Sequence, residues 1–315
     1  MKVIIFGGAG FIGSHFRDSL NRISDIEIRS YDLNPDQDST FLDVRKAIKI
    51  NEEFQKDDVI INLAAVHKTP GSPDHDYFET NIKGAENICM FAKEVGIERI
   101  LFTSSIAPYG ASEEEKFEDT LPTPNTPYGI SKLVAEYIHK SWASKSDSRK
   151  LLILRPGIVF GKGENGNFTR LGKAIEKGLF FYPGRKNTLK ACIYVKDLVK
   201  LSWILMLRQM DEIETFNFVY QPINTIEDIA NTVAKVTNQK KPNLTINGGL
   251  LKFVAKSLHL AGLSSLGFHP DRVNKLMTST NINGKKLRER ISTYNFTLEE
   301  AIQDWYKDCQ CKGLF

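Results

Sequence analysis

The chain has 315 residues, of which 41% are hydrophobic and 25% charged, proportions that are ordinary for a globular protein. Its formal net charge is only +4 and it has no long basic run, so nucleic acid is not indicated as a partner. No apolar stretch reaches about eighteen residues, which predicts no membrane-spanning helix.

The chain begins with a short apolar run, residues 3–6, which predicts a buried parallel strand. Glycines follow at 7, 10 and 13, and apolar residues then recur at helical spacing. Gly7 permits a tight turn, Gly10 lets the backbone approach a pyrophosphate, and Gly13 lets the helix pack closely on the strand. This order of strand, glycine loop and helix predicts a dinucleotide site.

A second strand is expected at residues 26–31 and ends at Asp32, which lies 19 residues beyond Gly13. A carboxylate at this place can accept hydrogen bonds from the ribose hydroxyls and repels a 2′-phosphate. Asp32 therefore favours NAD over NADP, although Arg29 nearby leaves room for NADP. The alternative is an aspartate that only opens a turn.

Residues 58–65 predict a third core strand, and the small side chains at its carboxyl end leave space for a cofactor. His67 follows at the rim, as a substrate contact or simply as a solvated histidine. An amphipathic helix is expected over residues 79–95 and a fourth strand over 99–103. The acidic tract at residues 113–119 predicts a solvated loop.

A tyrosine and a lysine, Tyr128 and Lys132, are four residues apart and so lie on one face of a predicted helix. An ammonium group beside a phenol lowers the phenol's pKa from about 10, which makes Tyr128 usable as an acid or base near neutrality. The pair follows Ser105, which comes just after the fourth strand. These three residues are the predicted catalytic group.

The chain resembles the extended short-chain dehydrogenase/reductase family. The resemblance rests on four motifs in this order: the glycine spacing with Phe11-Ile12, the Asn62-Leu63-Ala64-Ala65 run, Ser104 with Ser105, and the Tyr128–Lys132 pair. The type is the NAD-dependent epimerase/dehydratase, and the match covers roughly residues 1–230. The resemblance implies an α/β fold: a Rossmann-type doubly wound parallel sheet with a smaller, interleaved C-terminal substrate lobe. It places the NAD(P)-binding domain at residues 1–165, with parts of 190–225 returning to it, and the substrate lobe mainly at 166–315.

The resemblance also assigns roles to single residues. Asp43 and Val44 would contact the adenine; Asp43 could also cap a helix, and both roles could hold together. Asn81 would tie down backbone beneath the active site, and Lys190 would replace an arginine that grips the substrate diphosphate. The expected cofactor-binding residues are Gly7, Gly10, Phe11, Ile12, Gly13, Asp32, Asp43, Val44, Leu63, Ala64, Ala65, Asn81, Thr103, Tyr128, Lys132, Pro156 and Ile158. The expected substrate-binding residues are His67, Ser105, Asn167, Lys190 and Arg272.

The implied function is an NAD(P)-dependent nucleotide-sugar epimerase, or a reductase of a 4-keto sugar nucleotide. Dehydration is disfavoured, because Ser105-Ile106-Ala107 lacks the carboxylate that dehydratases carry there. A 3β-hydroxysteroid-dehydrogenase-like enzyme and a non-catalytic NAD(P)-sensing protein are the alternatives. The helices after Asn81 and Tyr128 commonly pair between subunits in this family, which implies a homodimer.

The four cysteines, Cys89, Cys192, Cys309 and Cys311, are scattered and predict reduced cytoplasmic thiols without a metal site. The N-terminal glycines and strand belong to the fold, so no secretory signal is expected. Residues 250–263 are apolar and leave three interpretations open: a core helix of the lobe, which such a pattern favours, a dimer face, or a patch against a membrane surface. A capping box, Thr297 with Glu300, predicts the start of the last helix.

Overall fold

The computed structural model describes residues 1–67, 72–208, 211–260, 276–291 and 296–314. The chain divides into two compact units. Unit 1 comprises residues 1–110, 118–156 and 195–217, and unit 2 comprises residues 111–117, 157–194 and 218–315. Residues 111–117 and 157–165 therefore belong to unit 2 and not to the unit that contains the glycine loop.

Unit 1 is built on a seven-stranded sheet with the strand order β12-β7-β5-β4-β1-β2-β3. The strands are β1 (Lys2–Phe6), β2 (Glu27–Asp32), β3 (Thr40–Phe41), β4 (Val59–Asn62), β5 (Arg99–Thr103), β7 (Lys150–Pro156) and β12 (Ile213–Phe218). Every pairing from β3 to β7 is parallel. The direction in which the strands follow one another reverses between β1 and β4, and such a switch point places a ligand crevice at the carboxyl ends of the strands.

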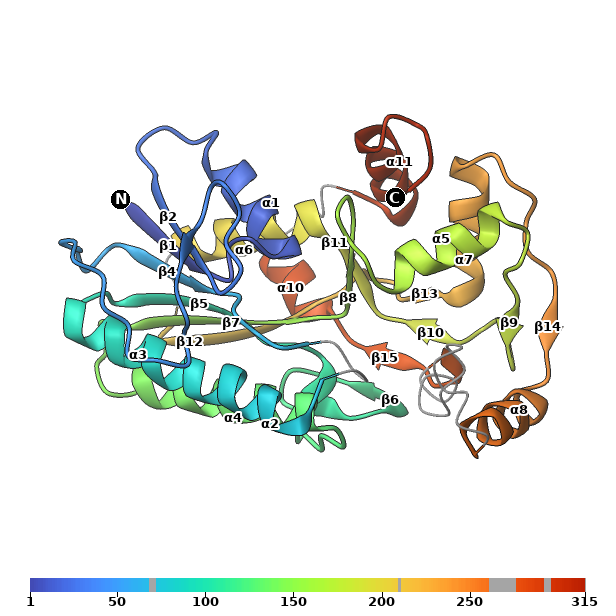
Figure 1. Ribbon diagram of the computed structural model, residues 1–315, viewed down its shortest axis with the longest axis horizontal. Helices are drawn as coiled ribbons and strands as arrows, with labels where there is room; N and C mark the ends of the chain where they lie inside the picture. Colours follow the sequence, from blue (N-terminus) through green and yellow to red (C-terminus); the bar gives the residue numbers. More distant parts are fainter. Residues whose placement is uncertain (68–71, 209–210, 261–275, 292–295, 315) are drawn as a thin grey trace. The chain divides into compact units, whose positions relative to one another are not determined.

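Helices cover both faces of this sheet, so its central strands are apolar and buried. Helices α1 (Phe11–Leu20) and α6 (Val195–Leu207) lie on one face, and α3 (Gly84–Val95) and α4 (Pro127–Ala143) on the other (Figure 1). The predicted Rossmann-type doubly wound fold is confirmed. The helix expected over residues 79–95 is interrupted, because a π-helical segment, η1 (Phe78–Lys83), joins the short α2 (Asp74–Tyr77) to α3.

Unit 2 contains a four-stranded sheet with the order β13-β10-β15-β6. Its strands are β6 (Ser112–Lys116), β10 (Leu189–Lys190), β13 (Asn224–Thr225) and β15 (Thr280–Ile282). The prediction of a solvated loop in the acidic tract is wrong for β6, which pairs in parallel with β15. The Glu113 carboxylate accepts hydrogen bonds from the Arg185 guanidinium at 2.5 Å and the Ser279 amide at 2.9 Å, and these bonds hold the acidic strand in place.

The rest of unit 2 consists of two short strand pairs and several helices. The strands are β8 (Ile158–Phe160) with β11 (Cys192–Tyr194) and β9 (Tyr182–Pro183) with β14 (Thr245–Ile246). The helices are α5 (Asn167–Glu176), α7 (Ile226–Val236), α8 (Gly248–Leu260), α10 (Lys285–Arg290) and α11 (Leu298–Asp308). The predicted capping box of Thr297 with Glu300 is confirmed at the start of α11. Within the described ranges no helix is both long and apolar enough to cross a membrane.

Candidate active site

The glycine loop joins β1 to α1 at the carboxyl edge of the sheet. Gly7 has a φ of +85°, and a Cβ there would come within 2.7 Å of the Ala64 amide nitrogen, so this position needs glycine. A Cβ on Gly13 would lie 2.4 Å from the Gly7 carbonyl oxygen. Gly13 therefore lets α1 pack directly against the loop, whereas the expected contact was with the strand; the tight turn expected at Gly7 is present.

The start of α1 fits a dinucleotide pyrophosphate. Gly10 is the exposed N-cap residue and has no capping side chain, so it supplies no acceptor for the first amides of the helix. The first turn, which includes Phe11 and Ile12, carries no acidic residue. Free amides at a helix N-terminus attract an anion, and a glycine N-cap leaves space for one to approach.

Asp32 ends β2 beside this loop. Its carboxylate accepts hydrogen bonds from the Ala9 amide at 3.1 Å and from the Asn34 amide at 2.9 Å. The residue thus closes its turn and also fixes the glycine loop, which is compatible with both roles expected for it. Arg29, the residue that left room for NADP, forms ion pairs with Glu52 and Glu27. These pairs make Arg29 a poor ligand for a 2′-phosphate.

Asp43 and Val44 follow β3 in a turn. The alternative of a helix cap at Asp43 is wrong, because residues 43–50 form no helix. The Asp43 carboxylate instead accepts hydrogen bonds from the Arg45 amide at 3.0 Å and the Arg45 Nε at 2.8 Å, as in an Asx turn. Val44 is buried, and its Cγ2 would lie 2.9 Å from a Cβ on Gly84.

The three predicted catalytic residues lie together in unit 1. Thr126 caps α4 by accepting a hydrogen bond from the Gly129 amide at 3.1 Å, and this places Tyr128 in the first turn of the helix. Ser105 follows β5 and lies next to Tyr128. Burial raises the pKa of Tyr128 to about 12, although the neighbouring Ser105 hydroxyl opposes the rise.

Lys132 lies one turn further along α4 and is buried. Its Nζ donates a hydrogen bond to the Thr103 carbonyl at 2.9 Å and lies 5.0 Å from the centre of the Phe102 ring. Burial lowers the pKa of Lys132 to about 7, and Glu136 opposes that shift. The prediction that Lys132 lowers the pKa of Tyr128 is wrong for this state, because desolvation dominates both groups.

The loop after β4 contains Leu63, Ala64 and Ala65, all half-buried. Asn81, in the π-helical segment, binds the Val66 backbone twice: its Oδ1 accepts from the amide at 2.8 Å and its Nδ2 donates to the carbonyl at 3.1 Å. The expected tie beneath the site is therefore present. A π-helical turn often marks a functional site.

His67, a predicted substrate contact, comes directly after Val66 in the chain. Desolvation and the positive charge of Lys132 both lower the pKa of its imidazole.

Sequence reasoning missed a buried network behind the catalytic group. The Glu136 carboxylate accepts hydrogen bonds from Ser104 Oγ at 2.6 Å, Arg155 Nε at 2.9 Å and Arg155 Nη2 at 2.6 Å. Arg155 Nη1 also donates to the Tyr109 hydroxyl at 2.8 Å. One sequence signal existed, because Glu136 lies four residues after Lys132 and so on the same helix face.

The remaining predicted residues lie at the end of β7, in unit 2 or in an undescribed range. Pro156 ends β7, and its carbonyl accepts a hydrogen bond from the Ile106 amide at 3.1 Å. In unit 2, Ile158 begins β8, and Asn167 begins α5. Lys190, also in unit 2, is buried, donates to the Thr278 carbonyl at 2.8 Å and has a pKa lowered by desolvation to about 8. Arg272 lies outside the described residues.

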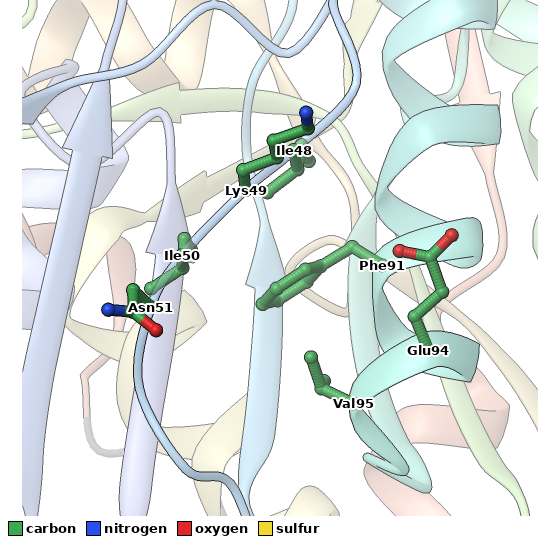
Figure 2. A pocket seen from close by; sticks show the side chains of 7 residues that line it. All are labelled: Ile48, Lys49, Ile50, Asn51, Phe91, Glu94 and Val95. Atoms are coloured by element: carbon green, nitrogen blue, oxygen red, sulfur yellow. The ribbon is translucent and has the colours of Figure 1, made fainter.

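A surface hollow of about 330 Å³ lies elsewhere in unit 1. Figure 2 shows the Phe91 side chain reaching from α3 toward Ile48 and Ile50. The last turn of α3 leads into the start of β5, so the hollow is at the amino edge of the parallel sheet. Ligands of such sheets bind at the carboxyl edge, and the hollow is therefore no part of the candidate active site.

Comparison with known proteins settles the family. Residues 3–218 match the NAD dependent epimerase/dehydratase family. The chain belongs to this family. The predicted resemblance is thus confirmed, and with it an NAD-dependent enzyme of the extended short-chain dehydrogenase/reductase type.

One sequence relative and two solved structures are similar to this chain along nearly its whole length. The N-acetyl-alpha-D-glucosaminyl-diphospho-ditrans,octacis-undecaprenol 4-epimerase of Escherichia coli O157:H7 is 29% identical over 320 residues, which cover 96% of this chain and 93% of the relative. The structure of MoeE5 in complex with UDP-glucose and NAD has a TM-score of 0.76 at 20% identity, covering 98% of this chain and 100% of that one. The UDP-glucuronic acid 4-epimerase from Bacillus cereus, in complex with NAD, has a TM-score of 0.73 at 20% identity, covering 98% and 99%.

Proposed function

We propose that the protein is an NAD-dependent 4-epimerase of a sugar carried on a diphosphate. The observation that carries the proposal is the grouping of Ser105, Tyr128 and Lys132 in the unit that holds the glycine loop. Its support comes from relatives named as 4-epimerases of UDP-sugars and of an undecaprenol-linked sugar. A sensing role is disfavoured, since both Tyr128 and Lys132 are present.

The chain's own residues would move the proton at the sugar C4 oxygen. A bound NAD would supply the hydride chemistry at C4, with removal from one face of the sugar and return to the other, so the reaction would have no net change in oxidation state. In its phenolate form, which needs the Lys132 ammonium stabilised beside it, Tyr128 takes the hydroxyl proton as the bond to hydrogen breaks at C4 and gives it back when the new bond forms. Ser105 donates a hydrogen bond to the same oxygen, and Lys132 holds the cofactor's ribose hydroxyls.

A diphosphate is the group that the named substrates of these relatives share. We propose that unit 1 binds NAD through those of the cofactor residues given above that it contains, which are all but Ile158, and that Lys190, in unit 2, is a ligand of the sugar diphosphate. Three of the proposed substrate ligands lie in the described chain: Lys190 and Asn167 in unit 2 and His67 in unit 1. The fourth, Arg272, lies outside the described residues. The lowered pKa of Lys190, about 8, still leaves its amine mostly protonated at neutral pH.

A homodimer in the cytoplasm is part of the proposal. Helices α3 and α4 lie side by side and expose apolar side chains, with Met90 54% and Tyr137 58% exposed. The apolar side chains that extend this face along α4 are half-buried: Leu133, Val134 and Ile138. The four cysteines are free thiols, which suits a reducing compartment. Light scattering that gives the mass of one chain at micromolar concentration would contradict the dimer.

The test of the reaction compares the wild type with Tyr128→Phe. Each is incubated with NAD and a panel of sugar diphosphates, including UDP-N-acetylglucosamine and N-acetylglucosaminyl-diphospho-undecaprenol, and the 4-epimer is measured by chromatography of the released sugar. The Phe variant should fold and bind NAD but lose about 10²- to 10⁴-fold in turnover. Ser105→Ala should cost less, since Tyr128 still reaches the oxygen. A Phe variant with near-full turnover would end this mechanism.

A further inference from the structure

Helix α8 in unit 2 presents an apolar face to solvent. Leu250, Phe253 and Val254 are 56%, 70% and 38% exposed. They stand at positions i, i+3 and i+4 of the helix and therefore share one face. The prediction of a core helix is therefore wrong for these three residues, and the dimer face and the membrane patch remain; residues 261–263 of the predicted stretch lie outside the described residues.

The same helix is anchored to unit 2 by its other side. Leu251 is buried and packs against Phe181, Ile246 and Met277. Phe181 and Ile246 adjoin or lie in the paired strands β9 and β14, so the base of the helix is structured. Packing fixes α8 in an orientation that leaves the apolar face outward.

The charged residues of α8 have one sign. Lys252 and Lys256 are exposed, lie four residues apart and follow one edge of the apolar face, on the side of Phe253, and the sequence of α8 contains no aspartate or glutamate. Lys240 and Lys241, in the segment that leads to β14, are exposed as well. A helix with aromatic and aliphatic side chains on one face and lysines beside it has the pattern of interfacial helices that lie in the headgroup region of a bilayer.

We propose that α8 docks the protein on an anionic membrane surface. The alternative is that a second copy of the chain binds to this face. The positive charges of Lys252 and Lys256 argue against that alternative. A two-fold interface uses the same patch on both subunits, so it would enclose the lysines beside the patch of each copy, and α8 offers no acidic residue to pair with them. An anionic lipid surface instead attracts all of them, and the apolar face enters the boundary between headgroups and acyl chains.

Docking has a consequence for the substrate, and this part rests on the proposed function. A sugar diphosphate on a polyprenol carrier lies at the membrane surface, whereas one on a nucleotide diffuses freely. A 4-epimerase held at the surface meets the first kind at high local concentration. The docking face therefore selects the lipid-linked sugar diphosphate as the substrate class.

Sedimentation with vesicles tests the docking without any assay of activity. The whole protein should sediment with vesicles of phosphatidylglycerol and phosphatidylcholine, less with phosphatidylcholine alone, and less at high salt. Leu250→Ser with Phe253→Ser should lower the partition coefficient by at least about tenfold. Lys252→Gln with Lys256→Gln should lower it by about tenfold or more on anionic vesicles only.

Two controls match these variants. Leu121→Ser removes a leucine that is 78% exposed in unit 1, and Lys173→Gln with Lys177→Gln removes two exposed lysines four residues apart at the end of α5. Both should bind vesicles like the wild type. Equal loss in the controls, or no vesicle binding by the wild type, overturns the proposal. So does a Leu250→Ser/Phe253→Ser protein that changes from dimer to monomer in light scattering while vesicle binding is unaltered.

The substrate part is tested with two probes. The Leu250→Ser/Phe253→Ser protein should keep its turnover on UDP-N-acetylglucosamine in solution if the wild type has any. It should lose about tenfold or more on N-acetylglucosaminyl-diphospho-undecaprenol in anionic vesicles. Equal turnover of variant and wild type on the vesicle-borne probe overturns the substrate selection. Absence of turnover on both probes in the wild type counts against the proposed function, while the vesicle-binding result still stands.

Discussion

The pair of Arg155 and Glu136 offers the sharpest test of what stabilises unit 1. Both side chains are almost completely buried, with exposed fractions of 3% and 0%. The substitution Arg155→Met keeps most of the side-chain volume but removes the two bonds to Glu136. It also removes those to the Tyr109 hydroxyl at 2.8 Å and the Glu118 carbonyl at 3.1 Å. Among the described residues, Ser104 then remains as the hydrogen-bond donor to the buried Glu136 carboxylate.

The cost follows from that uncompensated charge. Breaking one partner of a buried ion pair typically destabilises a protein by about 3 to 5 kcal/mol, and we expect this loss in the free energy of unfolding of Arg155→Met. Adding Glu136→Gln removes the charge but keeps an oxygen to accept from Ser104. The double variant should therefore be about 2 kcal/mol more stable than Arg155→Met, with its remaining cost set by unsatisfied polar groups.

Urea unfolding, followed by the fluorescence of Trp142 and Trp203 in unit 1, measures these values. The control is Arg99→Met, an arginine on β5 whose ion pair with the exposed Asp57 spans 3.6 Å. Surface pairs of this kind contribute about 0 to 1 kcal/mol, so this variant should change little. The reasoning is refuted if the double variant is no more stable than Arg155→Met, or if Arg155→Met loses no more than the control.

Three further predictions follow from the site and its surroundings. Asp32→Ser removes the carboxylate that repels a 2′-phosphate, so calorimetric titration should show a smaller difference between the affinities for NAD and NADP. Wild-type protein that binds NADP as tightly as NAD would contradict this role of Asp32. Burial lowers the pKa of His139 from 6.5 to about 4, so the unfolded chain binds more protons between these values and stability should fall by about 3 kcal/mol as pH drops through that window. In His139→Gln the urea midpoint of unfolding should change less with pH between pH 6.5 and about 4. An unchanged slope would mean that another group causes the pH dependence. Lys132→Met should weaken NAD binding yet raise the free energy of unfolding near pH 6, since it removes a buried charge; a loss of both would indicate a structural role.

The sequence predicted the parts of the site that are local. A glycine that needs a positive φ, a carboxylate at the end of a strand, and a tyrosine four residues before a lysine are all visible within a few positions. Parallel strands bring their carboxyl ends to one edge, and this rule alone places Gly7, Asp32, Ala64 and Ser105 near one another. The family order of these motifs then supplied the rest of the fold.

What the sequence could not predict depends on partners far along the chain. Glu113 reads as one acid among several in a polar run, but the Arg185 guanidinium and the Ser279 amide make its segment a strand. The sequence around Asp43 is compatible with a helix cap. In the structure its carboxylate accepts hydrogen bonds from the amide and Nε of Arg45, and the chain forms a turn there. In each case local propensity is weak, and a specific hydrogen bond decides the conformation.

The error over Tyr128 has a different cause, because the geometry of the pair was right and the electrostatics were wrong. Sequence reasoning treated Lys132 as a fixed positive charge, and a fixed charge would lower the pKa of a nearby phenol. Burial acts on the lysine too, so its pKa falls to about 7 while that of Tyr128 rises to about 12. Lys132 also donates to the Thr103 carbonyl. Tyr128 in this state is therefore a neutral donor, suited to hold the C4 oxygen, and it becomes a base only when further interactions stabilise the ammonium of Lys132 beside it.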